Sequence, residues 1–316
     1  MRQNRFGKRT IFTMLLCTAA AAALGGCGGK SKPQADTAVH IGVMYSSDIV
    51  PLTIITDQGL DKKHNFQLDM EVFSSAKDRD AAFQAGKLDG VFTDIIGLAM
   101  YQNAGLDVKA TGSTDGDYVL LAGKDTGITS LDEAAGKSVA ISENTLIEYS
   151  LDYILKNAGF DNTYLDKQVV PRIPDRLEML RNGKIDLVLL PEPLSYLAIK
   201  DGAAVLGSAN TDGLYPAVSA FTKTAIDEKS ETLKALYQAY DEAVDYLNNT
   251  PLEEYEAAII KDAGYPEELA GNTRLPVYRK NELPKAEVLK EAIGWAAEKG
   301  LCSPDLKPED MISELK

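Results

Sequence analysis

Short polar, acidic and aromatic side chains follow several predicted strands of this 316-residue chain, at positions suited to contacting a small molecule. Hydroxyl groups donate and accept hydrogen bonds, carboxylates accept them, and free N–H groups at a helix start bind acceptors. Each residue could instead shape a turn or cap a helix. The candidate contacts are Tyr45, Ser46, Ser47, Asp94, Ser113, Ser142, Asn144, Thr145, Glu192 and Tyr215.

Residue patterns typical of catalysis are scarce. The chain has two histidines, of which His40 precedes the first predicted strand and His64 falls in a charged turn. No Cys/His spacing suggests zinc, and neither a glycine-rich phosphate loop nor a nucleophile elbow is present. We therefore expect no catalytic residue, metal or cofactor. Because carboxylates can transfer protons, an enzyme acting on a small metabolite remains an alternative.

Predicted strands and helices alternate from Val39 onward, which indicates an α/β fold with parallel neighbouring strands. In such sheets, ligands bind beyond the carboxyl ends of the strands. This position is the one that the candidate contacts share. The predicted strands are Val39–Met44, Phe66–Phe73, Gly90–Thr93, Lys137–Ile141 and Ile185–Leu190.

Three four-residue patterns predict helix starts with capping boxes, in which two side chains satisfy free backbone donors. They are Ser130–Glu133, Thr145–Glu148 and Asp175–Glu178.

One internal similarity indicates two units of similar plan. Gly86–Asp94 and Gly183–Glu192 both read as a helix-ending glycine, a Lys-apolar-Asp turn and an apolar strand that runs into an acid. Chance could produce so short a match. Otherwise the two segments are equivalent elements of two lobes.

The first 26 residues resemble a secretory signal, because four basic residues precede the apolar run Ile11–Leu24. That run is shorter than the roughly 20 residues that span a membrane. Leu24-Gly25-Gly26-Cys27 resembles a bacterial lipobox, which predicts cleavage before Cys27 and its lipidation. A plain signal peptide is the alternative.

Cleavage would remove four positive charges and change the formal net charge from −14 to −18. Because a chain with this negative charge repels phosphate backbones, we expect no nucleic-acid partner. Cys302 would be the one cysteine left free, which excludes an internal disulfide. Residues 27–38 are small and polar and predict a flexible tether.

Three segments together resemble type II solute-binding proteins, the family that serves importers of sulfonates, taurine, nitrate and pyrimidine precursors. The segment Asp57–Asp69 resembles the family's first helix and second strand. Leu131–Ala140 resembles the start of its second lobe, and Arg181–Asp186, running on to Glu192-Pro193, its late strand and turn. The resemblance extends over nearly the whole mature chain.

This resemblance implies a periplasmic-binding-protein type II fold, with two α/β lobes joined by two crossing strands. We expect the crossings at Tyr118–Ala122 and Pro216–Thr222. Lobe 1 would comprise 39–122 and 218–316, and lobe 2 would comprise 123–217. Ligand would bind between the lobes, which close as a hinge.

The resemblance leaves the ligand open. Asp94 and Glu192 in one cleft would disfavour a small anion, because like charges at close range repel. Family members that bind nitrate or sulfonate also tend to have small or neutral residues where Asp94 stands. A pyrimidine-like vitamin precursor or an amine is therefore the first choice, and an alkanesulfonate or nitrate-type anion the second. Arg172 and Arg176 would favour the second choice if they faced inward.

The implied function is that of a monomeric lipoprotein, anchored on the outer face of the cell membrane, which delivers a solute to the permease and ATPase subunits of an ABC importer. A surface sensory protein that retained the fold is the other alternative.

Overall fold

The computed structural model describes residues 37–211 and 213–315. The predicted signal, Cys27 and the tether up to residue 36 lie outside the described residues. Within the described ranges, no helix combines the length and apolarity needed to cross a membrane. In the same part of the chain, no group of three or more His, Cys, Asp or Glu side chains could hold a metal ion.

The first sheet has the strand order β2-β1-β3-β10-β4. Strand β1 pairs in parallel with β2 and β3, whereas β10 runs antiparallel to β3 and β4. We call this sheet and the helices that pack on it lobe 1. Its strands are β1 (Ala38–Met44), β2 (Gln67–Phe73), β3 (Gly90–Asp94), β4 (Val108–Ser113) and β10 (Ala217–Thr222).

The second sheet has the strand order β7-β6-β8-β5-β9 and repeats the same pattern of parallel and antiparallel pairs. We call this sheet and its helices lobe 2. Its strands are β5 (Tyr118–Ala122), β6 (Ser138–Ile141), β7 (Asp166–Val169), β8 (Leu187–Pro191) and β9 (Ala204–Ser208).

The two similar segments of the sequence occupy equivalent places. Their strands, β3 and β8, are each the third strand of their sheet. The aspartate that precedes each strand accepts a hydrogen bond from the backbone of the neighbouring parallel strand. Asp89 Oδ2 accepts from the His40 N–H at 2.9 Å, and Asp186 Oδ2 accepts from the Ser138 N–H at 2.9 Å. Each carboxylate thereby holds the neighbouring parallel strand in register. The predicted two-lobed α/β fold is confirmed.

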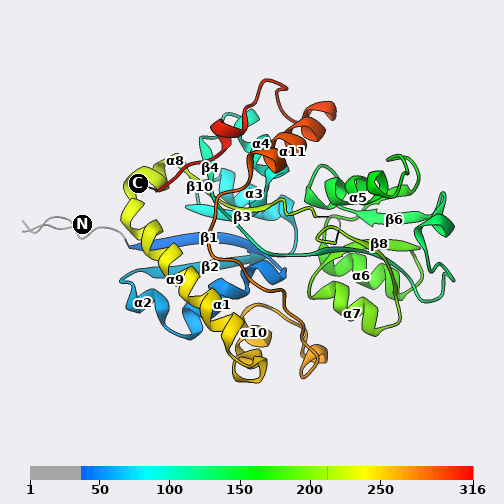
Figure 1. Ribbon diagram of the computed structural model, residues 1–316, viewed down its shortest axis with the longest axis horizontal. Coiled ribbons are helices and arrows are strands. Elements are labelled where there is room, and N and C mark those ends of the chain that lie inside the picture. Colours follow the sequence, from blue (N-terminus) through cyan, green and yellow to red (C-terminus); the bar gives the residue numbers. More distant parts are fainter. Residues whose placement is uncertain (1–36, 212, 316) are drawn as a thin grey trace, which may run out of the picture. The chain divides into compact units, whose positions relative to one another are not determined.

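Helices cover both faces of the lobe 1 sheet. Val39, Ile41 and Val43 of β1 point to one face and are fully buried in an apolar cluster with α1, α9 and α10. The opposite face carries α3, α4 and α11 (Figure 1). The helices are α1 (Val50–Asp57), α2 (Leu60–Lys63), α3 (Ala76–Gln84), α4 (Ile95–Asn103), α8 (Lys223–Glu228), α9 (Ser230–Asn249), α10 (Glu256–Asp262) and α11 (Ala286–Glu298).

The lobe 2 sheet is also covered on both faces, by α5 (Leu146–Asn157) on one and by α6 (Ile173–Arg181) and α7 (Leu194–Lys200) on the other (Figure 1). Strand β8 is therefore apolar at every position, as expected for a strand buried on two sides.

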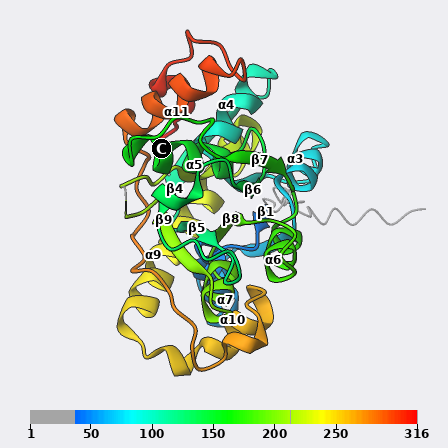
Figure 2. The ribbon, with the colours of Figure 1, turned by 90° about the vertical axis from the view of Figure 1, so that its right-hand side faces the viewer.

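One apolar cluster links the lobes through α4, α5 and α11. Helix α11 lies beside α4 in both views (Figures 1 and 2). Its Trp295 ring lies 5.3 Å from the ring of Tyr149 in α5. Helix α11 therefore contacts both lobes.

Several expected boundaries were wrong. Tyr118–Ala122, expected to cross between the lobes and to end the first part of lobe 1 at 122, is a strand inside the second sheet. Pro216–Thr222, expected as the return crossing, contains β10 of the first sheet, so the expected resumption of lobe 1 at 218 agrees with the start of β10 at Ala217. The chain therefore crosses between β4 and β5 and again between β9 and β10. Leu269, in a segment expected to belong wholly to lobe 1, packs into an apolar cluster of lobe 2.

The capping predictions had mixed outcomes. The box at Ser130–Glu133 is confirmed. Thr145 does cap α5, but Glu148 accepts from the Asn144 N–H instead of closing a box with Thr145. Helix α6 begins at Ile173, before the predicted start at Asp175, because Pro174 fits the first turn of a helix.

Candidate ligand-binding site

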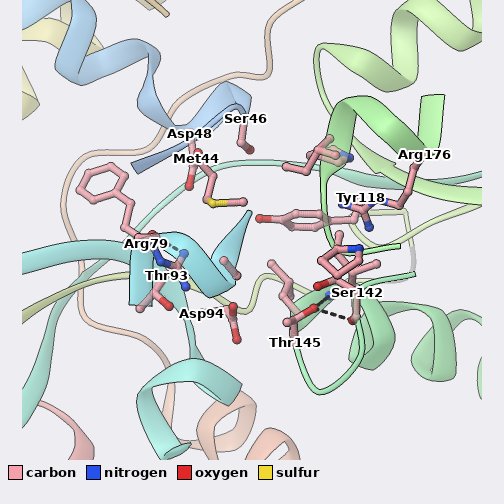
Figure 3. Close-up of a pocket in the computed structure, with 17 residues that line it drawn as sticks. Met44, Ser46, Asp48, Arg79, Thr93, Asp94, Tyr118, Ser142, Thr145 and Arg176 are labelled. Atoms are coloured by element: carbon pink, nitrogen blue, oxygen red, sulfur yellow. Dashed lines mark hydrogen bonds between the residues drawn. The ribbon is translucent and has the colours of Figure 1, made fainter. Parts of the chain in front are cut away.

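A cavity of about 60 Å³ lies between the lobes, at the carboxyl ends of strands from both sheets (Figure 3). Strands β1, β3, β6 and β8 all end at or beside it, which is where an α/β sheet positions a ligand. Its polar lining residues are Ser46, Asp48, Arg79, Thr93, Asp94, Tyr118, Ser142, Thr145 and Arg176. Its apolar lining residues are Met44, Ala76, Phe92, Leu146, Ile147, Pro171, Ile173 and Pro191.

Two buried carboxylates lie on the lobe 1 side. Asp94 caps α4, and its Oδ1 accepts from the Gly97 N–H at 2.9 Å. Asp48 Oδ2 accepts from Thr114 Oγ1 at 3.1 Å. Burial raises the pKa of Asp94, and it raises the pKa of Asp48 to about 6. Both acids therefore accept a proton or a hydrogen bond more readily than exposed carboxylates do.

Arg79 of α3 is buried in the same wall, but its hydrogen bonds are already made. Its Nη1 donates to the Phe92 carbonyl at 2.8 Å, and its Nε and Nη2 donate to Asp80 Oδ1 at 2.9 and 2.8 Å. Tyr101 donates to the same Asp80 oxygen at 2.5 Å. Burial alone would lower the pKa of Arg79, but these neighbours outweigh it and raise the pKa. Arg79 is thus a structural cation, neutralised by Asp80.

The start of α5 forms part of the lobe 2 wall. Thr145 Oγ1 accepts from the Ile147 N–H at 3.2 Å and donates to the Ser142 carbonyl at 2.8 Å. These bonds hold the 142–145 loop against the cavity, with Ser142 buried in its wall. The positive end of the α5 dipole therefore faces the cavity.

Arg176 of α6 is the exceptional group of the site. It is 1% exposed, and its Nε and Nη1 have no hydrogen-bond partner among the described residues. Burial lowers its pKa to about 9, with no carboxylate to oppose the effect. The side chain stays protonated at neutral pH, so an uncompensated cation lines the cavity.

Figure 3 shows the two walls facing each other. Asp48 and Asp94 come from one side, whereas Tyr118 and Arg176 come from the other, with the Tyr118 ring extending across the space. Neither histidine nor Cys302 lines the cavity. The chemistry that this arrangement offers is binding: a cation for an anionic group and carboxylates for hydrogen-bond donors.

Four of the ten predicted contacts come together in this cavity, namely Ser46, Asp94, Ser142 and Thr145. Two others lie in adjoining grooves: Tyr45 packs near Gly264, and Asn144, with φ of 57°, lies beside α4.

The other four predicted contacts line neither the cavity nor these two grooves. Ser47 is buried, and its carbonyl accepts from the Tyr278 hydroxyl at 2.9 Å. Glu192, which precedes a cis proline, is buried near Tyr196, and burial raises its pKa.

Ser113 and Tyr215 are further from the site. The Ser113 N–H donates to the Glu282 carbonyl at 2.7 Å. Tyr215 is 41% exposed, with the Arg279 guanidinium 5.0 Å from its ring centre. Neither is among the residues that line the cavity.

Arg79 and Tyr118 were missed as site residues. Asp48 had the same signal as Ser46, since both belong to the polar run after β1. Of the two arginines noted at the start of α6, Arg176 faces inward, whereas the Arg172 side chain is 58% exposed.

Comparisons with known proteins agree with this architecture. The model of the NMT1-like family matches residues 32–261. The chain belongs to the NMT1-like family. The type II solute-binding resemblance seen in the sequence is thereby confirmed.

Individual relatives of this NMT1-like protein are distant. A protein of Brachyspira hyodysenteriae, described as an ABC transporter periplasmic binding protein, is 25% identical over 262 residues, or 76% of this chain and 75% of the relative. The aliphatic sulphonate binding protein SsuA of Escherichia coli superposes with a TM-score of 0.73 at 18% identity, covering 89% of this chain and 93% of SsuA.

The nitrate-binding protein NrtA of Synechocystis has a TM-score of 0.66 at 13% identity, covering 86% of this chain and 84% of NrtA. At these identities the solved structures establish the fold alone. The relatives with named roles are described as binding proteins and not as enzymes, in agreement with the expectation from the sequence.

Proposed function

We propose that this protein is the solute-binding subunit of an ABC importer and that it captures a small organic anion between its lobes. The observation that carries the proposal is the buried, unpaired guanidinium of Arg176. An uncompensated buried cation costs several kcal/mol, because its hydration is lost without a replacing interaction. A sulfonate or carboxylate would supply the missing charge and accept the free N–H groups.

This proposal reverses the order of the two ligand classes expected from the sequence. The preference for a donor-rich solute depended on Asp94 and Glu192 facing the same space. Glu192 lies outside the lining, and one oxygen of Asp94 is used by the Gly97 N–H. The names of two structural neighbours, a sulphonate-binding and a nitrate-binding protein, support an oxyanion.

The remaining acceptors would set limits on the anion. Asp48 and the second oxygen of Asp94 favour a solute that also brings a hydrogen-bond donor. Bare nitrate offers no donor, so an organic anion with an amino or hydroxyl group fits the lining better.

The proposed location is the outer face of the cell membrane, with Cys27 as the lipidated first residue of a monomer. The basic residues, apolar run and Leu24–Cys27 motif support it. A Cys27→Ala variant, expressed in its host, should move from the membrane fraction to the soluble extracytoplasmic fraction. Retention of the variant on membranes would argue against the anchor.

The test of function is a melt of the body from Gly28 onward against sulfonates, carboxylates, amino acids, amines, nitrate and pyrimidine precursors. A ligand at 100 times its Kd stabilises the protein by about 2.7 kcal/mol. We expect a shift with organic anions and none with amines. A response confined to amines or neutral heterocycles would contradict the proposal. Unchanged solute uptake after deletion of the gene would favour the sensory alternative.

A further inference from the structure

The cavity is too small for more than the head of an organic anion. A cavity needs at least roughly 10–15 Å³ to hold one water-sized group. The 60 Å³ beside Arg176 therefore accommodates about four to six such groups. A sulfonate or carboxylate with one or two carbons fills it.

A larger groove of about 390 Å³ adjoins the cavity, and we call it the tail groove. It runs between α3 and α4 of lobe 1 and the loops that follow β6 and β7 of lobe 2. The two spaces share part of their lining and therefore lie side by side. The shared residues are Ala76, Arg79, Asp94, Ser142, Thr145 and Pro171.

Apolar side chains form part of the tail groove, among them Met100, Ala104, Val169 and Pro171. Val169 is 54% exposed and is one of four large hydrophobic residues that the described chain leaves exposed. An alkyl or aryl group that covered these side chains would be stabilised by the removal of apolar surface from water.

The charged groups of the tail groove would repel a second anion. Asp80, Asp94 and Glu143 line it, against Lys77 and Arg79. Arg79 is already bound to Asp80 and to the Phe92 carbonyl. The tail groove therefore offers an anion no free guanidinium, in contrast to the cavity at Arg176.

We infer that the tail groove is a second binding subsite, which takes the uncharged, apolar end of a monoanionic solute whose head lies beside Arg176. This inference rests on the proposed function. The two spaces would thus recognise different parts of the solute. The cavity recognises the charge of the head, and the tail groove recognises the length of the uncharged chain and excludes a second charge.

The test is calorimetric titration with methane-, butane- and hexanesulfonate, the carboxylates of equal length, and 1,4-butanedisulfonate. Each buried methylene should tighten binding about fourfold, the fold-change that corresponds to about 0.8 kcal/mol. Hexanesulfonate, or hexanoate if carboxylates are preferred, should then bind at least 100-fold more tightly than the one- or two-carbon acid. The disulfonate should bind at least tenfold more weakly than butanesulfonate.

A matched pair of variants locates the effect. Val169→Trp should fill the tail groove and remove the gain with chain length, while it leaves the shortest acid unaffected. Val205→Trp is the control, since Val205 is 51% exposed on β9, the opposite edge strand of the same sheet. Ala104→Trp, at an exposed position on the other wall, is a second filling variant.

The outcomes separate the two proposals. Binding that is independent of chain length, or a gain that persists in both filling variants, overturns the tail groove and leaves the proposed function standing. Binding of none of these acids, together with no response to any sulfonate, carboxylate or amino acid of the melting panel, overturns the proposed function, and the tail groove with it.

Discussion

Lys299, just after the last residue of α11, lies with its Nζ 2.6 Å from Glu148 Oε1 in α5 and so joins the end of the chain to lobe 2. One turn earlier, the Trp295 indole N–H donates to Asp152 Oδ2 at 3.0 Å. Lys167 of β7 lies 3.1 Å from Glu148 and 2.5 Å from Asp152. Burial alone would raise the pKa of Glu148, but Lys299, the Asn144 N–H and Lys167 outweigh it and lower the pKa.

These contacts form a polar clasp, defined by Glu148, Asp152, Lys167, Trp295 and Lys299, that links α11 to lobe 2 in the arrangement of the lobes seen here. We expect Lys299→Met to weaken solute binding about three- to tenfold, through faster dissociation. Without the Lys299–Glu148 contact, the arrangement of the lobes that surrounds the ligand is less stable, so the lobes separate more often. Stopped-flow kinetics measure the effect. Lys290→Met, which changes an exposed lysine of the same helix, is the control. Equal dissociation rates in both variants would show that the clasp does not act on closure.

Asp48 predicts a dependence of stability on pH. Burial raises its pKa from 3.8 to about 6, against the opposing effects of Thr114 and Arg79. A raised carboxyl pKa contributes stability that is complete below pH 3.8 and lost as pH rises through about 6. The loss is about 3 kcal/mol, at about 1.4 kcal/mol per pKa unit.

The Asp48→Asn variant keeps the shape and cannot ionise. Its stability relative to the wild type should therefore increase between pH 4 and pH 7.5, by an amount of that order. Urea unfolding without ligand at several pH values measures the difference. A difference that stays constant across the range would mean that Asp48 is not the titrating group.

Gly90 is required by the close packing of β3 on β10. A Cβ at this position would lie 2.4 Å from Phe221 Cδ1 and 2.7 Å from the Ala220 carbonyl oxygen, which cannot move away without breaking the ladder. Gly90→Ala should therefore destabilise the protein by about 1–3 kcal/mol.

Gly294→Ala is the matched control for that substitution. Gly294 lies within α11, and a Cβ there meets nothing within 4 Å. This variant should gain about 0.5–1 kcal/mol, because alanine loses less backbone entropy in a helix. Thermal unfolding of both variants decides the point, and equal effects would contradict the packing argument.

The sequence was most informative where local chemistry repeats. Asp89 and Asp186 follow the same turn and hold the same neighbouring strand, so the two-lobed plan could be predicted from them. The crossings could not, because β5 is buried on every residue and its sequence does not show which sheet it joins.

The residues of the site were likewise predictable in part. Ser46, Asp94 and Ser142 were predictable because parallel strands end at one edge of a sheet. The orientation of Arg176 was not, since it depends on where α6 begins and on how the lobes close. Glu192 was misplaced for a similar reason: its position in the sequence marks the strand end but not the direction of its side chain.

The most direct test of the account is the melting temperature of Arg176→Met, with and without the best anion from the panel, beside Arg172→Met as an exposed control. Removing an uncompensated buried cation should stabilise the ligand-free protein by about 1–4 kcal/mol, at about 2–4 °C per kcal/mol for a chain of this size. The account predicts a raised melting temperature and the loss of the ligand-induced shift. A lowered melting temperature, or a shift as large as that of the wild type, would contradict it.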